Sequence, residues 1–353
     1  MDATILISTR NRAQYLKHTL DSLSRIRIDG IKVELIVIDN GSSDETRAVA
    51  TEAARRFPFR VQLLSFARGA KAAALNYALP TAGGRYLVFT DDDLRFDALW
   101  LLELLAPLRA GQAEAVVGEI RLPPHLTRSW MEPTHRAMLA QVRPNDERHQ
   151  LVGANMAMSR GCFDSVGAFD PALGPGALGL SEEVLLDRQI RCKGGRIQFA
   201  AGAVVEHHFD PKRLERPAWI RHAKASGNSN AYIFHHWDRG SVRWLALRRT
   251  KRAIQVGFGT LSGRGRREAG SPIDAREIAQ INYLAFLKQL GIQRRTDPKY
   301  SATSTASLDA GAGVIPETFQ RGDWTGNRIE TKHYGGSMEL TERGMLRRRT
   351  ENR

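Results

Sequence analysis

The stretch Tyr86-Leu-Val-Phe-Thr-Asp-Asp-Asp93 runs from a short apolar strand directly into three consecutive aspartates. Like charges this close repel each other, and fixing them at the end of a buried strand costs free energy. A hard cation offsets that cost, since Mg²⁺ and Mn²⁺ prefer oxygen ligands, commonly carboxylates together with substrate phosphates. Open parallel sheets bind their ligands beyond the carboxyl ends of the strands. The stretch therefore predicts a metal site for a phosphate-bearing substrate, with a solvated acidic turn as the alternative.

Strands and helices alternate around this stretch. Apolar, β-branched runs predict strands at residues 4–8, 33–38, 61–65, 85–90 and 115–120, then at 196–200 and 203–207. Apolar residues at helical spacing predict helices over residues 12–26, 71–79, 97–108, 181–193 and 273–290, and Ser42-Ser43-Asp44-Glu45 resembles a capping box for another. This βαβα order is typical of a mostly parallel sheet with helices on both faces.

Composition narrows the class of protein. The 353 residues, 42% of them hydrophobic, allow one large domain or two ordinary ones. Cys162 and Cys192 lie far apart, which argues against a disulfide framework or zinc ribbon and favours a reducing cytosol. No basic leader precedes the first strand and no run of 18 apolar residues occurs, so we expect neither a signal peptide nor a membrane-spanning helix. A net charge of +14 favours anionic partners: nucleotides, nucleic acid or an acidic membrane face.

A basic segment at 239–267 contains no acid. Its basic residues are Arg239, Arg243, Arg248, Arg249, Lys251, Arg252, Arg264, Arg266 and Arg267, with apolar residues interleaved. The segment predicts a basic amphipathic helix of the kind that lies on anionic lipid, with nucleic-acid binding or a solvated arm as alternatives. We expect a catalytic domain over 1–237, a basic helical extension over 238–298 and a disordered tail over 299–353.

Six blocks of sequence, taken in order, resemble the glycosyltransferase family 2 pattern over roughly residues 1–235. They are ILISTRNRAQYLKHTLDSL, ELIVIDNGSSDET, GAKAAALNYAL, YLVFTDDDLRFD, LVGANMAMSRGCFDSVGAFDPAL and GLSEEVLLDRQIRCKGGRIQFAAGAVVEHH. One block alone is weak evidence, whereas six in the family's order are specific. The resemblance implies the GT-A fold, a Rossmann-like sandwich, here followed by C-terminal helices and the tail.

By this resemblance, residues after the first two strands would bind the nucleotide. Asp39 or Asn40 would hold the base, since a carboxylate accepts well from an imide N–H. A turn-forming role is the alternative for both. Thr9 and Arg10 would line the same pocket, with a solvated loop charge as the alternative for Arg10. Lys71, at the start of an Ala-rich helix, would reach a phosphate as a point charge.

The resemblance assigns Asp91 and Asp93 to an Asp-x-Asp pair that holds Mg²⁺ or Mn²⁺. Asp93 would bind the metal directly, Asp91 would contact the ribose or support the metal, and Asp92 would contribute to the nucleotide-sugar site. Alternation along an extended segment points Asp91 and Asp93 to the same side. The metal would neutralise the departing diphosphate. His207 would also approach the metal, and Asn76 the nucleotide sugar, with structural roles as the alternatives for both.

Glu182-Glu183 takes the place of the family's Glu-Asp pair. The resemblance makes Glu183 the general base, which would deprotonate an acceptor hydroxyl attacking the anomeric carbon opposite the nucleotide. Glu is one methylene longer than the usual Asp, and Ser181 replaces a glycine and is expected to cap the helix. Because the helix dipole stabilises acids in a first turn whatever else they do, a structural role is the alternative.

Two further stretches have weaker assignments. Trp130, Met131 and His135 fall where the acceptor would pass, and an aromatic face suits a sugar ring, but a core tryptophan is the favoured interpretation. Arg221 and Lys224 resemble the family's basic stretch near the diphosphate.

The resemblance implies a metal-dependent, inverting glycosyltransferase. We expect a nucleoside-diphosphate sugar as donor, a UDP-sugar first, and a glycan, lipid-linked or other cell-surface acceptor, as in cell-wall or polysaccharide biosynthesis. A cytoplasmic location with peripheral contact at the inner face of the membrane is expected, and no nucleic acid. A nucleotidyltransferase is the enzymatic alternative, but residues 8–12 lack the glycine-rich phosphate loop that it would need. A non-catalytic protein that binds nucleic acid or membrane is the other alternative.

Overall fold

The computed structural model describes residues 1–66, 69–240, 242, 244–262 and 270–300, together with three short strands beyond them. The strands are β1 (Ala3–Thr9), β2 (Val33–Asp39), β3 (Arg60–Ser65), β4 (Tyr86–Thr90), β5 (Leu94–Phe96), β6 (Ala115–Arg121), β7 (Asn155–Ser159), β8 (Ile197–His207), β9 (Arg328–Ile329), β10 (Met338–Leu340) and β11 (Leu346–Arg348). The helices are α1 (Ala13–Leu23), α2 (Thr46–Ala54), α3 (Lys71–Ala78), α4 (Trp100–Arg109), α5 (Pro133–Met138), α6 (Arg160–Val166), α7 (Glu182–Cys192), α8 (Arg216–His236), α9 (Leu245–Ser262) and α10 (Ala275–Gln293). Short 3-10 turns are η1 (Leu79–Thr81), η2 (Pro124–Leu126) and η3 (Pro211–Leu214).

The main sheet has the order β3-β2-β1-β4-β7-β6-β8-β5. Strands β1 to β4 are mutually parallel, β6 and β8 are parallel to each other, and β7 and β5 run against their neighbours. The predicted mostly parallel α/β sheet is therefore confirmed. The carboxyl ends of β1, β2 and β4 lie side by side, which brings the residues after them to one edge.

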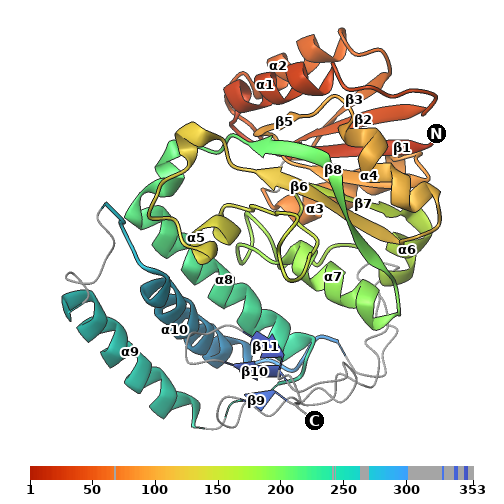
Figure 1. Ribbon diagram of the computed structural model, residues 1–353. Coiled ribbons are helices and arrows are strands. Elements are labelled where there is room, and N and C mark those ends of the chain that lie inside the picture. The colour runs from red at the N-terminus through yellow and green to blue at the C-terminus, as the bar shows by residue number, and fades with distance from the viewer. Residues whose placement is uncertain are drawn as a thin grey trace.

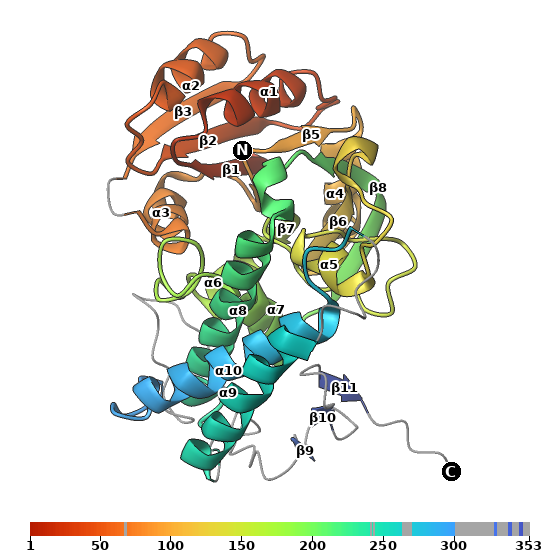
Figure 2. The ribbon, with the colours of Figure 1, turned by 90° about the vertical axis from the view of Figure 1, so that its left-hand side faces the viewer.

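Helices cover both faces of the parallel half, with α1 and α2 on one side of β1–β3 and α3 on the other (Figure 2). The core side chains of β1, β2 and β4 are buried, because these strands are sandwiched between the two helical layers. Trp100 at the start of α4 is fully buried and donates from Nε1 to Asn155 Oδ1 at 2.8 Å. The aspartate triplet thus follows a strand in the middle of a packed sheet.

The C-terminal helices form a second layer of packing beside the sheet, in which α10 contacts both α8 and α9 (Figures 1 and 2). None of the described helices combines the length and the hydropathy that crossing a bilayer requires. Arg243 and the arginines of 264–267 lie outside the described residues, as does most of the predicted tail over 299–353. The domain boundaries stay predictions.

Several local predictions were wrong. The two strands expected at 196–200 and 203–207 are one strand, β8, whose pairing with β6 shifts register between Gly118 and Glu119. Ser181 does not cap α7 with its side chain, and it has a left-handed backbone with φ 78°. The capping box before α2 is absent as well. Instead, Asp44 Oδ1 accepts from the backbone N–H of Thr46 at 3.0 Å.

Candidate active site

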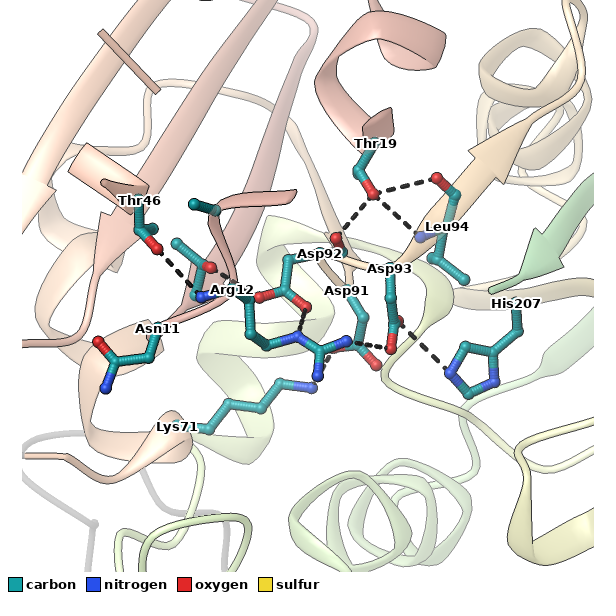
Figure 3. Close-up of polar contacts among 12 residues, drawn as sticks. Asn11, Arg12, Thr19, Thr46, Lys71, Asp91, Asp92, Asp93, Leu94 and His207 are labelled. Atoms are coloured by element: carbon teal, nitrogen blue, oxygen red, sulfur yellow. Dashed lines mark hydrogen bonds and ion pairs between the residues drawn. The ribbon is translucent and has the colours of Figure 1, made fainter. Parts of the chain in front are cut away.

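Asp92 anchors the triplet to the sheet. It is buried, and both of its carboxylate oxygens are used (Figure 3). Thr9 Oγ1 donates to Oδ2 at 2.6 Å and Arg12 Nε donates to Oδ1 at 2.7 Å. Thr19 Oγ1 also donates to the Asp92 carbonyl at 2.7 Å. Burial raises the pKa of Asp92 to about 6, although the charge of Arg12 opposes the shift. These contacts give Asp92 and Thr9 supporting tasks within the protein.

One carboxylate oxygen of Asp93 is hydrogen-bonded, and the other, called its open oxygen below, has no hydrogen-bond donor in the described part of the chain. Arg12 Nη2 donates to Oδ2 at 2.6 Å, whereas Oδ1 is buried without a hydrogen-bond donor among the described residues. The atom that Oδ1 faces is His207 Nε2, at 3.4 Å (Figure 3). Burial raises the pKa of Asp93, but His207, Arg12 and Arg213 lower it more, so the net direction is downward. Asp93 is therefore ionised at neutral pH.

The pair formed by Asp93 and His207 fits a divalent cation. His207 Nδ1 lies 2.8 Å from the carbonyl oxygen of Leu139, so this nitrogen carries a proton and donates it. With its Nδ1 proton engaged in this way, the ring could offer the Nε2 lone pair to a cation that the open oxygen of Asp93 also binds. A histidine whose other N–H is fixed by a carbonyl is the usual arrangement of a metal ligand. No third His, Cys, Asp or Glu completes a metal cluster in the described part of the chain, so substrate phosphates or water would supply the remaining ligands.

Asp91 contacts Lys71 (Figure 3). The Lys71 ammonium forms a short ion pair with Asp91 Oδ1, and its backbone N–H donates to Pro175 at 2.9 Å. Burial lowers the pKa of Lys71, while Asp91 and then Glu182 raise it more, so Lys71 stays charged. Arg12 thus pairs with Asp92 and Asp93, and Lys71 pairs with Asp91. The joint role of Asp91 and Asp93 at a metal stays a prediction.

Glu183 stands in the wall of a cavity of about 670 Å³ that Lys71, Asp91 and His207 also line. Burial, and next the charge of Glu182, raises the pKa of Glu183 well above the ordinary value. A carboxyl with a raised pKa, facing an open cavity, has the properties of a general base that works near neutral pH.

The loop before α7 holds these residues in place. Gly174 has φ 83°, and a Cβ there would lie 2.9 Å from Glu182 Oε2, so only glycine fits beneath that carboxylate. Asn76 joins the same loop to α3, because its Nδ2 donates to the Phe169 carbonyl at 2.8 Å and its Oδ1 accepts from the Phe169 N–H at 3.0 Å. Both amide groups of Asn76 are therefore used by the backbone, as the structural alternative for this residue required.

The predicted base-binding residues lie on the other side of the strand ends. Asp39 and Asn40 are buried and make turn contacts: Asp39 Oδ1 accepts from the Ser42 N–H at 2.9 Å, and Asn40 Oδ1 from the Gly69 N–H at 3.1 Å. Arg10 is exposed beside Gly69. Their nucleotide contacts stay predictions, and Thr9, Arg10, Asp39 and Asn40 do not line the cavity.

Trp130 is a core tryptophan, as the favoured interpretation of the sequence predicted. Trp130, Met131 and His135 are buried in a hydrophobic cluster with Trp219 and do not line the cavity. Arg221 and Lys224 are exposed and do not line it either.

Sequence reasoning missed three residues. Arg12 pairs with Asp92 and Asp93, and Arg213 and His222 line the cavity. Of these three residues, Arg12 alone could have been suggested by the sequence. It is a cation that follows the first strand, whose carboxyl end was expected to lie beside the aspartate triplet.

The comparisons with known proteins agree with this geometry. Residues 4–167 match the family described as Glycosyl transferase family 2. Glucosyl-3-phosphoglycerate synthase of Mycobacterium tuberculosis (strain ATCC 25618 / H37Rv) is 32% identical over 117 residues, which are 32% of this chain and 36% of that protein. The minor teichoic acid biosynthesis protein GgaB of Bacillus subtilis (strain 168) is 27% identical over 92 residues, 26% of this chain and 10% of that protein. The chain thus spans well under half the length of these curated relatives.

Among solved structures, the mannosyltransferase PcManGT of Pyrobaculum calidifontis, in complex with GDP-Man and Mn²⁺, superposes with a TM-score of 0.50. The two are 20% identical, and the match covers 87% of this chain and 76% of the other. At this identity the likeness concerns the fold alone. Together with the sheet order, it confirms the predicted GT-A arrangement.

Proposed function

Because residues 4–167 of this chain belong to glycosyl transferase family 2, we propose that the protein is a metal-dependent, inverting glycosyltransferase. It moves a sugar from a nucleoside-diphosphate sugar to a glycan, a lipid-linked sugar or another cell-surface acceptor. The observation that carries the proposal is the single cavity lined by Glu183, Asp91 and His207, with the open oxygen of Asp93 facing His207.

Each residue then has a defined task. Glu183 takes the proton of the acceptor hydroxyl, and its raised pKa makes it a competent base. Asp93 and His207 would hold Mg²⁺ or Mn²⁺, which when bound supplies positive charge against the departing diphosphate. Lys71 orients Asp91 and adds a fixed positive charge to the cavity wall. Thr9, Arg10, Asp39 and Asn40 receive the nucleoside at the neighbouring strand ends.

The donor and acceptor classes are supported by the relatives. The solved mannosyltransferase is in complex with GDP-Man and Mn²⁺, and the synthase from M. tuberculosis is named for a glucosyl product. The name of GgaB refers to teichoic acid, which supports a role in cell-wall or polysaccharide biosynthesis. A UDP-sugar is the first donor to test, and no nucleic acid partner is proposed.

A thermal-shift panel of nucleotide sugars, each with and without Mn²⁺, tests the proposal. One nucleotide should raise Tm only when metal is present, since a ligand at 100 times its Kd stabilises by about 2.7 kcal/mol. The matched control is the same nucleotide with EDTA. An equal rise in Tm without metal would contradict the metal dependence of nucleotide binding. No rise in Tm with any nucleotide sugar would contradict the proposed function.

Helix α9 and the residue before it supply the evidence for the proposed contact with the inner face of the membrane. Leu247 and Ile254 of α9 are 66% and 54% exposed, and their spacing of seven residues places them along one side of the helix. Trp244, which directly precedes α9, is 73% exposed. The four basic residues among positions 248–252 of this helix flank the apolar side chains without any acid. An exposed apolar stripe flanked by positive charge is the pattern that docks on anionic lipid.

Vesicle flotation measures this contact. The full-length protein should float with vesicles that contain phosphatidylglycerol and stay behind with neutral ones, and Leu247→Glu combined with Ile254→Glu should abolish flotation. Leu99→Glu, a change at an exposed leucine outside α9, is the control that should float normally. Competition by DNA that displaces the vesicles would instead favour the nucleic-acid alternative.

A further inference from the structure

The cavity beside Glu183 lies apart from the residues assigned to the nucleoside. Its volume of about 670 Å³ is within the ordinary range for a small-molecule site, and none of Thr9, Arg10, Asp39 or Asn40 lines it. Glu183, the proposed base, does line it. Lys71, Asp91 and His207, assigned to the donor phosphates and the metal, line one part of it. If the proposed function holds, the acceptor hydroxyl meets the base in the same cavity, so the lining away from these three residues carries information about the acceptor.

The described lining contains no Trp, Tyr or Phe, and it holds five Lys and Arg side chains together with four carboxylates, Asp91, Asp146, Glu182 and Glu183. Asp91 is paired with Lys71 and Asp146 with Arg143, so two of the carboxylates are already matched by cations of the same lining. Its positively charged residues are Lys71, Arg136, Arg143, Arg148 and Arg213, joined by the imidazoles of His207 and His222. Neutral sugar rings commonly pack on aromatic faces. A cavity without such faces, and with guanidinium groups instead, is better suited to an anion.

Arg213 is the cation with the greatest need for a partner. No carboxylate of the described residues forms an ion pair with it, and its polar contacts are long: 3.3 Å from Nη2 to the Met138 carbonyl and 3.4 Å from Nη1 to His207 Nε2. The Arg213 side chain is only partly exposed to solvent. A desolvated charge without close counter-charge is costly, and a bound oxyanion would remove that cost.

His222 on α8 is a second donor on the same wall. Burial, followed by the charge of Arg213, lowers the pKa of His222 to about 4, so the ring is neutral at physiological pH. It makes no hydrogen bond with the rest of the described protein. Its N–H can therefore be given to a ligand that Arg213 attracts.

The other arginines are held to different degrees. Arg143 pairs with Asp146 at 3.3 Å, and Arg148 approaches Asp187 at 3.7 Å. Asp187 is already bound by Arg191 at 2.8 Å, so Arg148 is the weaker of its two partners. Arg136 has no carboxylate partner in the described part of the chain and donates from Nε to the Met131 carbonyl at 3.2 Å.

We propose that the acceptor is an anion, a compound with a phosphate or carboxylate group near the hydroxyl that receives the sugar. Arg213 and His222 bind the oxyanion, Arg136 adds long-range attraction, and Glu183 faces the hydroxyl in the same cavity. The inference rests on the proposed function, which by itself allows neutral acceptors as well. Because the donor diphosphate is also an oxyanion and His207 is close to Arg213, the test must separate the two sources.

Binding by calorimetry, without turnover, makes that separation. Glycerol 3-phosphate and its neutral match, glycerol, are titrated into the full-length protein, alone and then in the presence of UDP and Mn²⁺. The phosphate compound should bind, glycerol should not, and UDP should leave the binding in place. Arg213→Gln should weaken binding by tenfold or more, which corresponds to about 1.4 kcal/mol.

Arg221→Gln is the matched control, since it removes an exposed arginine of α8 that lies outside the cavity lining. Arg213→Lys should recover part of the affinity because it restores the charge without the planar fork. The inference is overturned if neither glycerol 3-phosphate nor inorganic phosphate binds, if Arg213→Gln and Arg221→Gln behave alike, or if UDP with Mn²⁺ displaces the phosphate compound. If the protein binds nucleotide sugars in the thermal-shift panel but binds no phosphate compound, the anionic acceptor is contradicted and the proposed function is not. If the protein binds the phosphate compound but binds no nucleotide sugar, the proposed function is contradicted instead.

Discussion

Asp93→Asn is expected to lower the metal-dependent kcat by about a thousandfold, which corresponds to about 4 kcal/mol of lost transition-state stabilisation. Asn has the shape of Asp but no charge, so it fills the same space and no longer offers the open oxygen a negative charge. Oδ1 of Asp93 faces His207 and has no hydrogen-bond donor among the described residues, whereas both oxygens of Asp92 are bound by Thr9 and Arg12 and Oδ1 of Asp91 is paired with Lys71. The measurements are transfer of sugar at saturating Mn²⁺ and Mn²⁺ binding by electron paramagnetic resonance.

Stability separates the effect on the metal from an effect on the fold. The pKa of Asp93 is depressed in the folded protein, so its ionised form stabilises the fold above the ordinary aspartate pKa of about 4, and that contribution is lost as the pH falls. Asp93→Asn should therefore be less stable than the wild type at pH 7, and the difference should shrink as the pH falls through 4. Asp97→Asn, beyond the triplet, is the control for charge removal in this region. Wild-type turnover by a folded Asp93→Asn protein would rule out the metal assignment.

Glu183→Gln is expected to lower kcat by roughly 10²–10⁴-fold, the usual contribution of a positioned general base. The donor KM should change little, because the residues assigned to the nucleoside lie outside the cavity that Glu183 lines. The base must be ionised to act, so the wild-type rate should fall as the pH drops through the raised pKa of Glu183. The measurement is the pH dependence of kcat/KM for wild type and variant. The fall in rate toward low pH, the acidic limb of the profile, should appear in the wild type only.

The neighbouring glutamate supplies the matched variant. The charge of Glu182 is the second largest cause of the raised pKa of Glu183, so Glu182→Gln should keep the base and shift the acidic limb to lower pH. Because the folded-state pKa of Glu183 is raised, its ionised form costs stability at higher pH, and Glu183→Gln should be at least as stable as the wild type at pH 8. An unchanged limb in Glu182→Gln, or a nearly active Glu183→Gln, would place the base elsewhere.

The parallel half of the fold could be predicted because its signals are local. Each of the strands β1, β2 and β4 is a short apolar run whose burial depends only on its place in the sheet. The continuity of β8 could not be predicted, since Gly202 interrupts the apolar run and the strand is completed by pairing with β6, some eighty residues earlier. The short strand β5 is likewise formed by pairing with β8, far along the chain.

The candidate site shows the same limit. Alternation along the chain placed Asp91 and Asp93 on one side, but their partners come from β8, from α3 and from the turn after β1. Arg12 lies 80 residues from Asp92 in the sequence, and no residue near the triplet indicates that Arg12 will form ion pairs with it. Which aspartate stays open is therefore decided by contacts between distant segments, whereas the position of the triplet at a strand end is visible in the sequence.

The ion pairs of Arg12 have a consequence for how the chain reaches its folded state. Arg12 and Lys71 stand against the three aspartates, so the acidic strand end carries its own counter-ions. In many small metalloproteins the ion is needed for folding, since only the ion can neutralise its ligands. Here the protein supplies that neutralisation itself, and a single net negative charge is left over. The chain is therefore expected to fold without the proposed metal, and binding of that metal would be a later, separate event.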